Sequence, residues 1–172
     1  TVPKQGSNPL GGVASITTAA RRVIEITPKT EAFIQACKRG RVGIYAVNLT
    51  KSKVVTYVIV QGRTGGRKGP QEAAATNVLI QIAHAELDAQ PKGPKIIAGD
   101  FNADPKNLPH LQSLVQNEGW TDLGAKANMW GGIPEENTCM GHNAKNSTSN
   151  DYALANSQCL PLVKGMRVMP SK

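Results

Sequence analysis

Aromatic residues are scarce in this chain of 172 residues. Phe, Trp and Tyr make up 4% of it, although hydrophobic residues as a whole make up 40%. A chain of this length forms one domain with a sizeable core, and that core must rest on Val, Ile, Leu and Ala. The sequence also lacks internal repeats, low-complexity tracts, a signal peptide and any apolar run long enough to span a membrane.

The chain has few cysteines, and their spacing matches no common disulfide or metal-binding motif. Cys37, Cys139 and Cys159 are an odd number, and no two of them have the C-x-x-C spacing. This pattern excludes a disulfide framework and a zinc site. Free, partly buried thiols in a reducing compartment are the simplest interpretation, so we expect an intracellular protein.

Acidic residues are outnumbered by basic ones. The chain has 12 Asp and Glu against 20 Lys and Arg, a net charge of +8. A basic balance favours anionic partners such as nucleic acid, phosphorylated ligands or acidic membranes. A soluble basic protein without such a partner is the alternative that charge alone leaves open.

The apolar pattern predicts an α/β fold with a mixed sheet, because strands and helices alternate and one pair of strands forms a hairpin. Residues 31–41 are either a loop or a short helix, and residues 119–149 are expected to be a long loop. The expected strands are residues 11–18, 23–26, 43–49, 54–60 and 95–100, followed by two late strands at 151–156 and 161–168. The expected helices are residues 71–87 and 108–118.

The two helices carry specific expectations. Apolar residues of the first one recur at helical spacing, which predicts that this face is buried; they are Ala75, Val78, Leu79, Ile82 and Ala85. In the second helix, Asn107 is expected to cap the start, with Pro109 in the first turn.

The stretch KIIAGDFNADP, residues 95–105, places polar side chains at the end of an apolar strand. Alternation along a strand predicts that Asp100 and Asn102 point to the same side and Phe101 to the other. Gly99 permits a close approach of the backbone. A carboxylate at a strand end can act as a base on water or bind a hard metal ion, and an amide can orient a phosphate oxygen. Asp104 is expected to form an Asx turn before Pro105.

Four stretches in consistent order resemble one known family. IIAGDFN is similar to its hallmark strand, YVIVQGRTGG to its strand and Gly-rich loop, GWTDL to a downstream segment and NTCMGHNAKNSTSNDYAL to its closing strand. The family is the endonuclease/exonuclease/phosphatase superfamily, typified by abasic-site endonucleases, deoxyribonuclease I and retrotransposon endonuclease domains. The resemblance runs from about residue 11 to the C-terminal end.

The resemblance implies a DNase I-like, four-layer α/β sandwich, in which two packed mixed β-sheets are flanked by helices. It also implies phosphodiester hydrolysis with Mg²⁺ or Mn²⁺, in which the ion neutralises charge on the phosphoryl group. Nucleic acid, with DNA first, is then the expected partner, and the nucleus the expected location. A retrotransposon-type endonuclease is the specific expectation; the oligomeric state is not predicted.

Site residues follow from the matched motifs. Asp100 would orient or deprotonate the attacking water, Asn102 would hold a phosphate oxygen, and both would contact the metal ion. Asp151 matches the Asp that orients the family's catalytic His. The residues expected to bind substrate are Gln61, which stands where the family has Tyr, the loop residues Arg63, Arg67 and Lys68, and Thr138.

Several family features have no counterpart. The metal-binding Glu would precede residues 11–18, and Glu25 is not a substitute for it. The closing Ser-Asp-His would follow residues 161–168, and neither His110 nor His142 matches its His. Asn150 replaces an apolar residue, which would be costly if it were buried without partners. We therefore expect one partial domain over residues 1–172, truncated at both ends, inactive as it stands and poorly soluble.

Two other functions stay open. The chain could be a non-catalytic nucleic-acid-binding remnant, or a family member that hydrolyses a small phosphorylated substrate. A basic groove past Asp100 would favour nucleic acid, whereas a closed pocket would favour the small substrate. Of the remaining candidates, His84 is expected to be a structural or surface residue rather than a ligand. Trp120 is expected to pack near the second helix, and Trp130 to anchor a loop rather than stack on a base.

Overall fold

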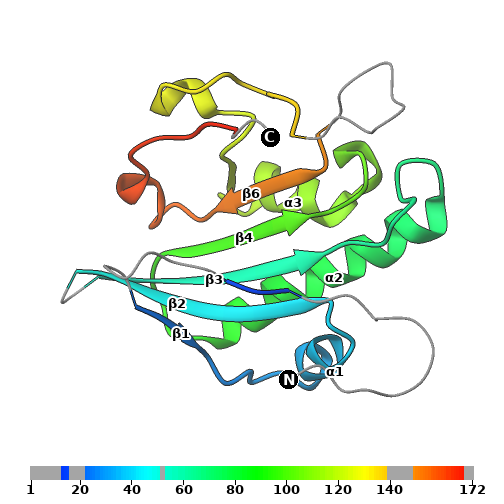
Figure 1. Ribbon diagram of the computed structural model, residues 1–172, viewed down its shortest axis with the longest axis horizontal. Coiled ribbons are helices and arrows are strands. Elements are labelled where there is room, and N and C mark those ends of the chain that lie inside the picture. The colour runs from blue at the N-terminus through cyan, green and yellow to red at the C-terminus, as the bar shows by residue number, and fades with distance from the viewer. Residues whose placement is uncertain (1–12, 16–21, 51–52, 139–148, 169–172) are drawn as a thin grey trace.

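A six-stranded mixed sheet is the centre of the fold in the computed structural model, which describes residues 13–15, 22–50, 53–138 and 149–168 (Figure 1). Its strands are β1 (Val23–Glu25), β2 (Val42–Thr50), β3 (Lys53–Gln61), β4 (Lys95–Asp100), β5 (Thr121–Asp122) and β6 (Asp151–Ala155). The helices are α1 (Glu31–Lys38), α2 (Pro70–Ala89) and α3 (Pro109–Asn117), with 3-10 turns η1 (Pro105–Asn107), η2 (Ala127–Trp130) and η3 (Leu160–Leu162).

The strand order is β1-β2-β3-β4-β6-β5, and only β3 and β4 run parallel. A parallel pair needs a long crossover, which α2 supplies between them. The α/β class and the mixed sheet are confirmed. The described residues form one sheet, and the second sheet of the expected sandwich is not among them.

The two faces of the sheet are covered differently. The larger core lies between the sheet and the helices, of which α2 and α3 are behind the strands in Figure 1. It includes the buried side chains of Val58, Val60 and Ile97. A smaller cluster on the opposite face packs Val55 and Ala155 against the η2 and η3 segments. No helix of the described residues is long and apolar enough to cross a membrane.

Most expected elements are present, and the differences are local. Residues 31–38 form a helix, whereas only η3 lies in the late strand expected at 161–168. The loop expected at 119–149 contains β5 and η2. Of the strand expected at 11–18 only residues 13–15 are described, and they form no strand. Leu108 rather than Asn107 precedes α3, because Asn107 ends the turn η1, while Pro109 does occupy the first position of the helix.

The buried face of α2 differs from the expected one. Val78 is 49% exposed, whereas the polar residues Thr76, Asn77 and Glu86 are buried. Each of them accepts a hydrogen bond from a neighbouring segment: Thr76 from the Arg63 N–H, Asn77 from the His110 N–H and Glu86 from the turn before α1. Apolar spacing misplaced this face because satisfied polar side chains occupy it.

The buried Glu86 carboxylate ties the turn between β1 and α1 to α2. One oxygen accepts from the Lys29 N–H (2.8 Å) and the Gln90 side chain (2.7 Å), and the other accepts from the Thr30 N–H (2.8 Å) and hydroxyl (2.7 Å). Burial alone would raise the pKa of Glu86, but these hydrogen bonds hold it below its ordinary value. The carboxylate therefore stabilises the fold at neutral pH.

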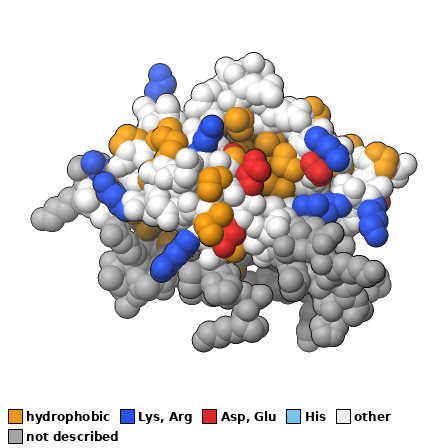
Figure 2. Space-filling model, turned by 90° about the horizontal axis from the view of Figure 1, so that it is seen from above, with side chains coloured by type: hydrophobic (Ala, Val, Ile, Leu, Met, Phe, Trp, Pro, Cys, Tyr) orange, Lys and Arg blue, Asp and Glu red, His pale blue; other side chains and the backbone are white. Residues whose placement is uncertain are grey.

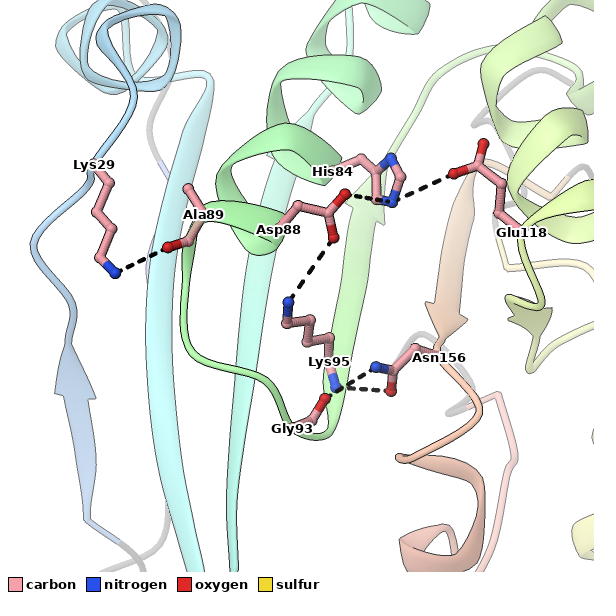
Figure 3. Close-up of polar contacts among 8 residues, drawn as sticks. All are labelled: Lys29, His84, Asp88, Ala89, Gly93, Lys95, Glu118 and Asn156. Carbon is pink, nitrogen blue, oxygen red and sulfur yellow. Dashed lines mark hydrogen bonds and ion pairs between the residues drawn. The ribbon is translucent and has the colours of Figure 1, made fainter.

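A second polar cluster joins α2, α3 and β4 (Figure 3). The Nε2 atom of His84 lies 3.4 Å from an Asp88 oxygen and 3.7 Å from a Glu118 oxygen, and Lys95 lies 3.9 Å from Asp88. The His84 ring packs edge-on against Trp120, at 5.5 Å between ring centroids. His84 is thus structural. Trp120 packs at the end of α3, as expected, and its backbone N–H donates to the Leu114 carbonyl.

The start of β4 is held by Asn156, which Figure 3 also shows. Its side-chain oxygen accepts from the Lys95 N–H at 3.0 Å, and its side-chain nitrogen donates to the Gly93 carbonyl at 3.0 Å. Lys29 makes a similar tie to the end of α2 by donating to the Ala89 carbonyl. These contacts fix the connection between α2 and β4, so that β4 enters the sheet in one register.

We predict that Glu86→Gln destabilises the protein by about 1–3 kcal/mol although it preserves the side chain's shape. Either orientation of the amide turns its NH₂ toward donors that now face an oxygen, and this leaves them unpaired. Urea unfolding at pH 7 measures the effect, with the exposed Glu31→Gln as the control. In the wild type, the stabilisation by Glu86 should be lost as the pH falls through the lowered pKa of its carboxyl group. Equal stability of Glu86→Gln and the wild type at pH 7 would contradict a stabilising role of Glu86.

A second prediction concerns His110, whose Nε2 is buried without a hydrogen-bond partner in the described residues. Burial and the neighbouring His84 lower the pKa of His110, although Glu118 acts in the opposite direction. Because the unfolded chain then binds the proton more readily, stability should fall as the pH drops below about 6.5. The melting temperature of His110→Phe should depend less on pH between 7.5 and 5.5 than that of the wild type. An unchanged pH dependence would show that His110 does not cause the loss of stability.

Candidate active site

The strands β3 and β4 end, and β6 begins, at the right-hand end of the sheet in Figure 1. The strand register pairs Gln61 with Asp100 and Asp100 with Asp151. Because neighbouring residues alternate between faces, all three belong to the face opposite the helices. The Gln61 side-chain nitrogen donates to an Asp100 oxygen at 3.3 Å. The structure therefore brings together three residues that the motifs placed in the site.

Asn102 contacts Asp100 through its backbone N–H and not as a continuation of the strand. β4 ends at Asp100, and Asn102 has a left-handed backbone with φ of 52°, a conformation that Asn tolerates better than most residues. The turn brings the Asn102 N–H to the other Asp100 oxygen at 3.1 Å. Phe101 is fully buried on the helix side and stacks on Tyr152, as alternation predicted. Strand alternation itself does not extend to Asn102.

Two glycines let the backbones of β3 and the GDFN turn meet. A Cβ atom on Gly62 would lie 2.3 Å from the Phe101 carbonyl oxygen, and one on Gly99 would lie 2.0 Å from the Val60 oxygen. The Gly62 N–H donates to the Asp100 carbonyl at 2.7 Å. The Gly-rich loop that follows β3 is thereby held directly against the turn that carries Asp100 and Asn102.

Asp151 is positioned by side chains on both sides of the site. The Thr138 hydroxyl accepts from the N–H groups of Asn150 and Asp151, each at 3.1 Å. The Arg67 guanidinium donates to the Asn150 side chain at 2.9 Å and to the Ser149 carbonyl. Asn150 therefore has a partner and is only half-buried, so its polarity costs little here. In the structure Thr138 and Arg67 hold the start of β6.

The other basic residues of the loop are exposed. Arg63 is anchored through its N–H to the Thr76 hydroxyl at 2.8 Å, and its side chain, like that of Lys68, extends from the loop surface. Arg41 lies beside this loop. The Gln61 N–H donates to the Arg41 carbonyl, and the Arg41 guanidinium donates to the Gly62 carbonyl at 3.3 Å. Arg41 was not among the expected site residues, since only strand pairing connects it to the loop.

A cavity of about 620 Å³ opens beside Asp151, between β6, η2 and the segments at 133–138 and 166–168. Figure 2 looks onto this side, where acidic and basic side chains border a hollowed, partly apolar surface. Its charged lining is Asp122, Glu135, Glu136 and Asp151 with Arg67 and Arg167. Burial raises the pKa of Asp122, and Glu135 raises it further, although two N–H groups donate to its carboxylate. The cavity thus has an acidic lining.

The described residues do not form a complete metal site. Both oxygens of Asp100 already accept hydrogen bonds, and no group of three or more His, Cys, Asp or Glu in the described parts is arranged to hold an ion. Mg²⁺ is often bound through one or two carboxylates with water and substrate phosphates. Metal contact by Asp100 and Asn102 therefore stays a prediction, and we assign no step to a metal ion.

Asp104 and Trp130 have the roles that the sequence predicted. Asp104 accepts from the Lys106 N–H and starts η1, as predicted for an Asx turn. Trp130 packs against the smaller core cluster and anchors its loop. Burial raises the pKa of the free Cys37 thiol to about 11 and raises that of Cys159, so neither is a reactive thiolate. Cys139 and His142 lie outside the described residues.

Comparisons with known proteins identify the fold. No protein-family model matches the sequence, and no curated protein matches it. A humanized D. rerio TDP2 structure is similar with a TM-score of 0.55 at 12% identity, covering 79% of this chain and 53% of that one. D. rerio TDP2 complexed with a single strand DNA product gives 0.53 at 14% identity, covering 79% and 54%.

A beta hairpin deletion mutant of beta toxin from Staphylococcus aureus is also similar, with a TM-score of 0.53 at 13% identity, covering 77% of this chain and 49% of that one. At these identities the similarity establishes the fold alone, which confirms the expected α/β architecture. The chain spans about half the length of the structures that it matches.

We predict that Gly62→Ala destabilises the protein by about 3 kcal/mol, because a new methyl group would meet the Phe101 backbone and neither segment can move freely. Gly165→Ala is the matched control: its Cβ would meet no atom closer than 4.0 Å, the Trp130 oxygen. Urea unfolding of both variants measures the difference. Equal stability of the two would show that the Gly-rich loop does not depend on this contact.

Proposed function

We propose that this chain is part of a phosphodiesterase domain that acts on nucleic acid, and that it belongs to the endonuclease/exonuclease/phosphatase superfamily. The observation that carries the proposal is the alignment of Gln61, Asp100 and Asp151 across three strand ends. The backbone contact at Gly62 places a basic loop directly beside them. The matched motifs and the shared fold support the same assignment.

The side chains at this edge suit a phosphate and an attacking water. Asp100 supplies the carboxylate that orients or deprotonates the water. Gln61 and Asn102 are neutral donors that can hold phosphate oxygens without adding negative charge. Asp151 is exposed beside them and is assigned the orienting role of the matched family residue. Neither His84 nor His110 lies at this edge, so the histidine that Asp151 would orient is not one of the described residues.

The distribution of charge favours a nucleic-acid strand over a small phosphorylated substrate. The cavity beside Asp151 has four carboxylates against two guanidinium groups in its lining, which disfavours an enclosed phosphate. On the other side of Asp100, Arg63 and Lys68 are exposed and can contact a backbone without reading sequence. The similar D. rerio structure that holds a single strand DNA product is consistent with this proposal.

Finer parts of the function are proposed on the resemblance. They are a requirement for Mg²⁺ or Mn²⁺, DNA as the substrate, retrotransposon-type endonuclease activity and a nuclear location. A second candidate is a protein that binds nucleic acid without cleaving it. The exposed side chains of Arg63 and Lys68 support this candidate, because they can contact a phosphate backbone whether or not it is cleaved.

The phosphodiesterase proposal predicts that the chain nicks supercoiled plasmid in the presence of Mg²⁺. The double variant Asp100→Ala/Asn102→Ala should abolish nicking, because it removes the carboxylate and the amide at the proposed phosphate site. Asp104→Asn is the matched control, since Asp104 caps η1 four residues along and should not affect cleavage.

The outcome separates the two candidates. Salt-sensitive plasmid binding without nicking would exclude catalysis by this chain and support the binding protein. Nicking that persists in the double variant would show that another site is responsible. If neither binding nor nicking occurs at low salt, the proposed function is wrong for this chain.

A further inference from the structure

Arg41 and Arg63 lie together on a second cavity, separate from the one beside Asp151. This cavity has a volume of about 470 Å³ and is lined by Arg41, Arg63, Thr64, Gln71, Glu72 and Ala75. Arg41 precedes β2, and Arg63 belongs to the loop after β3, so two distant parts of the chain contribute one guanidinium each. The remaining lining residues come from the loop and the first turns of α2.

Within the described part of the chain, the two guanidinium groups have no carboxylate partner. No carboxylate of the described residues forms an ion pair with either of them. Burial lowers the pKa of Arg41, and the charge of Arg63 lowers it further, so the two groups repel each other. Glu72 lines the same cavity, but its carboxylate is turned toward Gly69, at the start of α2. An anion between the arginines would relieve their repulsion.

The position of this cavity indicates which anion it would take. Arg41 donates to the Gly62 carbonyl, and Gly62 in turn contacts the backbone of Phe101, next to Asp100. Arg63 directly follows Gly62 and is held there because its backbone N–H donates a hydrogen bond to the Thr76 hydroxyl. The cavity therefore adjoins, at Gly62, the turn that carries Asp100. Paired guanidinium groups are well suited to a phosphate, since each can donate two parallel hydrogen bonds.

We propose that Arg41 and Arg63 form a phosphate subsite that binds one backbone phosphate of the nucleic acid, next to the phosphate at Asp100. The assignment to a nucleic acid rests on the proposed function, whereas the anion site rests on the cavity and on two guanidinium groups that form no ion pair with the described residues. The sequence alone pointed to Arg63 only, as one of several loop residues. The pairing of β2 with β3 brings Arg41 beside Arg63, so that the two arginines line one cavity.

The test uses the whole chain with Arg41→Gln, Arg63→Gln and the double variant, each checked for folding by thermal unfolding. Lys53→Gln, Lys92→Gln and their double variant are matched controls. Both lysines are exposed, Lys53 begins β3 and Lys92 precedes β4, so both lie at the opposite end of the sheet. Each single variant lowers the net charge of +8 by one, as its control does.

Two readouts are measured. The first is binding of a single-stranded oligonucleotide as a function of salt. We expect each single Arg variant to weaken binding about tenfold at low salt. The double variant should lose less than the product of the two single effects, because both arginines hold one phosphate. Its slope of log affinity against log salt should fall by about 0.7, the value for one phosphate on a single strand.

The second readout is binding of inorganic phosphate, observed through the arginine side-chain N–H resonances of Arg41 and Arg63. Phosphate-dependent shifts at both, together with the affinity losses above, support the subsite. Phosphate binding at this pair without any oligonucleotide binding would preserve the anion site but overturn its assignment to nucleic acid, along with the proposed function. Oligonucleotide binding that the Arg variants affect no more than the Lys controls would overturn the subsite and leave the proposed function standing. A slope change twice as large in the double variant would show two separate phosphates and overturn the shared site.

Discussion

The candidate site depends on a backbone contact between two glycine-containing segments. Gly62, directly after β3, lies against the carbonyl of Phe101, and Gly99 in β4 lies against the carbonyl of Val60. These contacts allow β3 and β4 to stay paired up to their last residues, so that Gln61 and Asp100 end side by side. Any side chain at Gly62 would separate the Gly-rich loop from the turn that presents Asp100 and Asn102.

Polar side chains then hold the loops around that contact. Thr76 anchors Arg63, and Arg67 donates to Asn150. The Thr138 hydroxyl accepts from the N–H groups at the start of β6 and just before it. Loops that carry functional residues are commonly positioned by a rigid scaffold in this way. The polar residues on the buried face of α2 serve the same end, because they satisfy backbone groups of segments that have no partner in the sheet.

Charge is divided around Asp100 in a way that the net charge of +8 does not reveal. The cavity on the Asp151 side has an acidic lining, whereas the cavity on the Gly62 side carries two guanidinium groups without ion-pair partners in the described residues. A phosphate chain would therefore be drawn to one side of the candidate site and repelled from the other. This asymmetry gives the proposed strand a direction of approach.

The sequence by itself determined most of the helices and strands and which residues stand at the end of β4. Short-range patterns predicted β2, β3, β4, α2, α3, the burial of Phe101 and the turn at Asp104, because alternation, helical spacing and turn chemistry act between near neighbours. Tertiary structure decided the rest. The buried face of α2, the partner of Asn150 and the pairing of Arg41 with Arg63 all depend on hydrogen bonds and strand registers between residues far apart in the chain. No local pattern encodes such contacts, since they exist only once the sheet has brought those segments together.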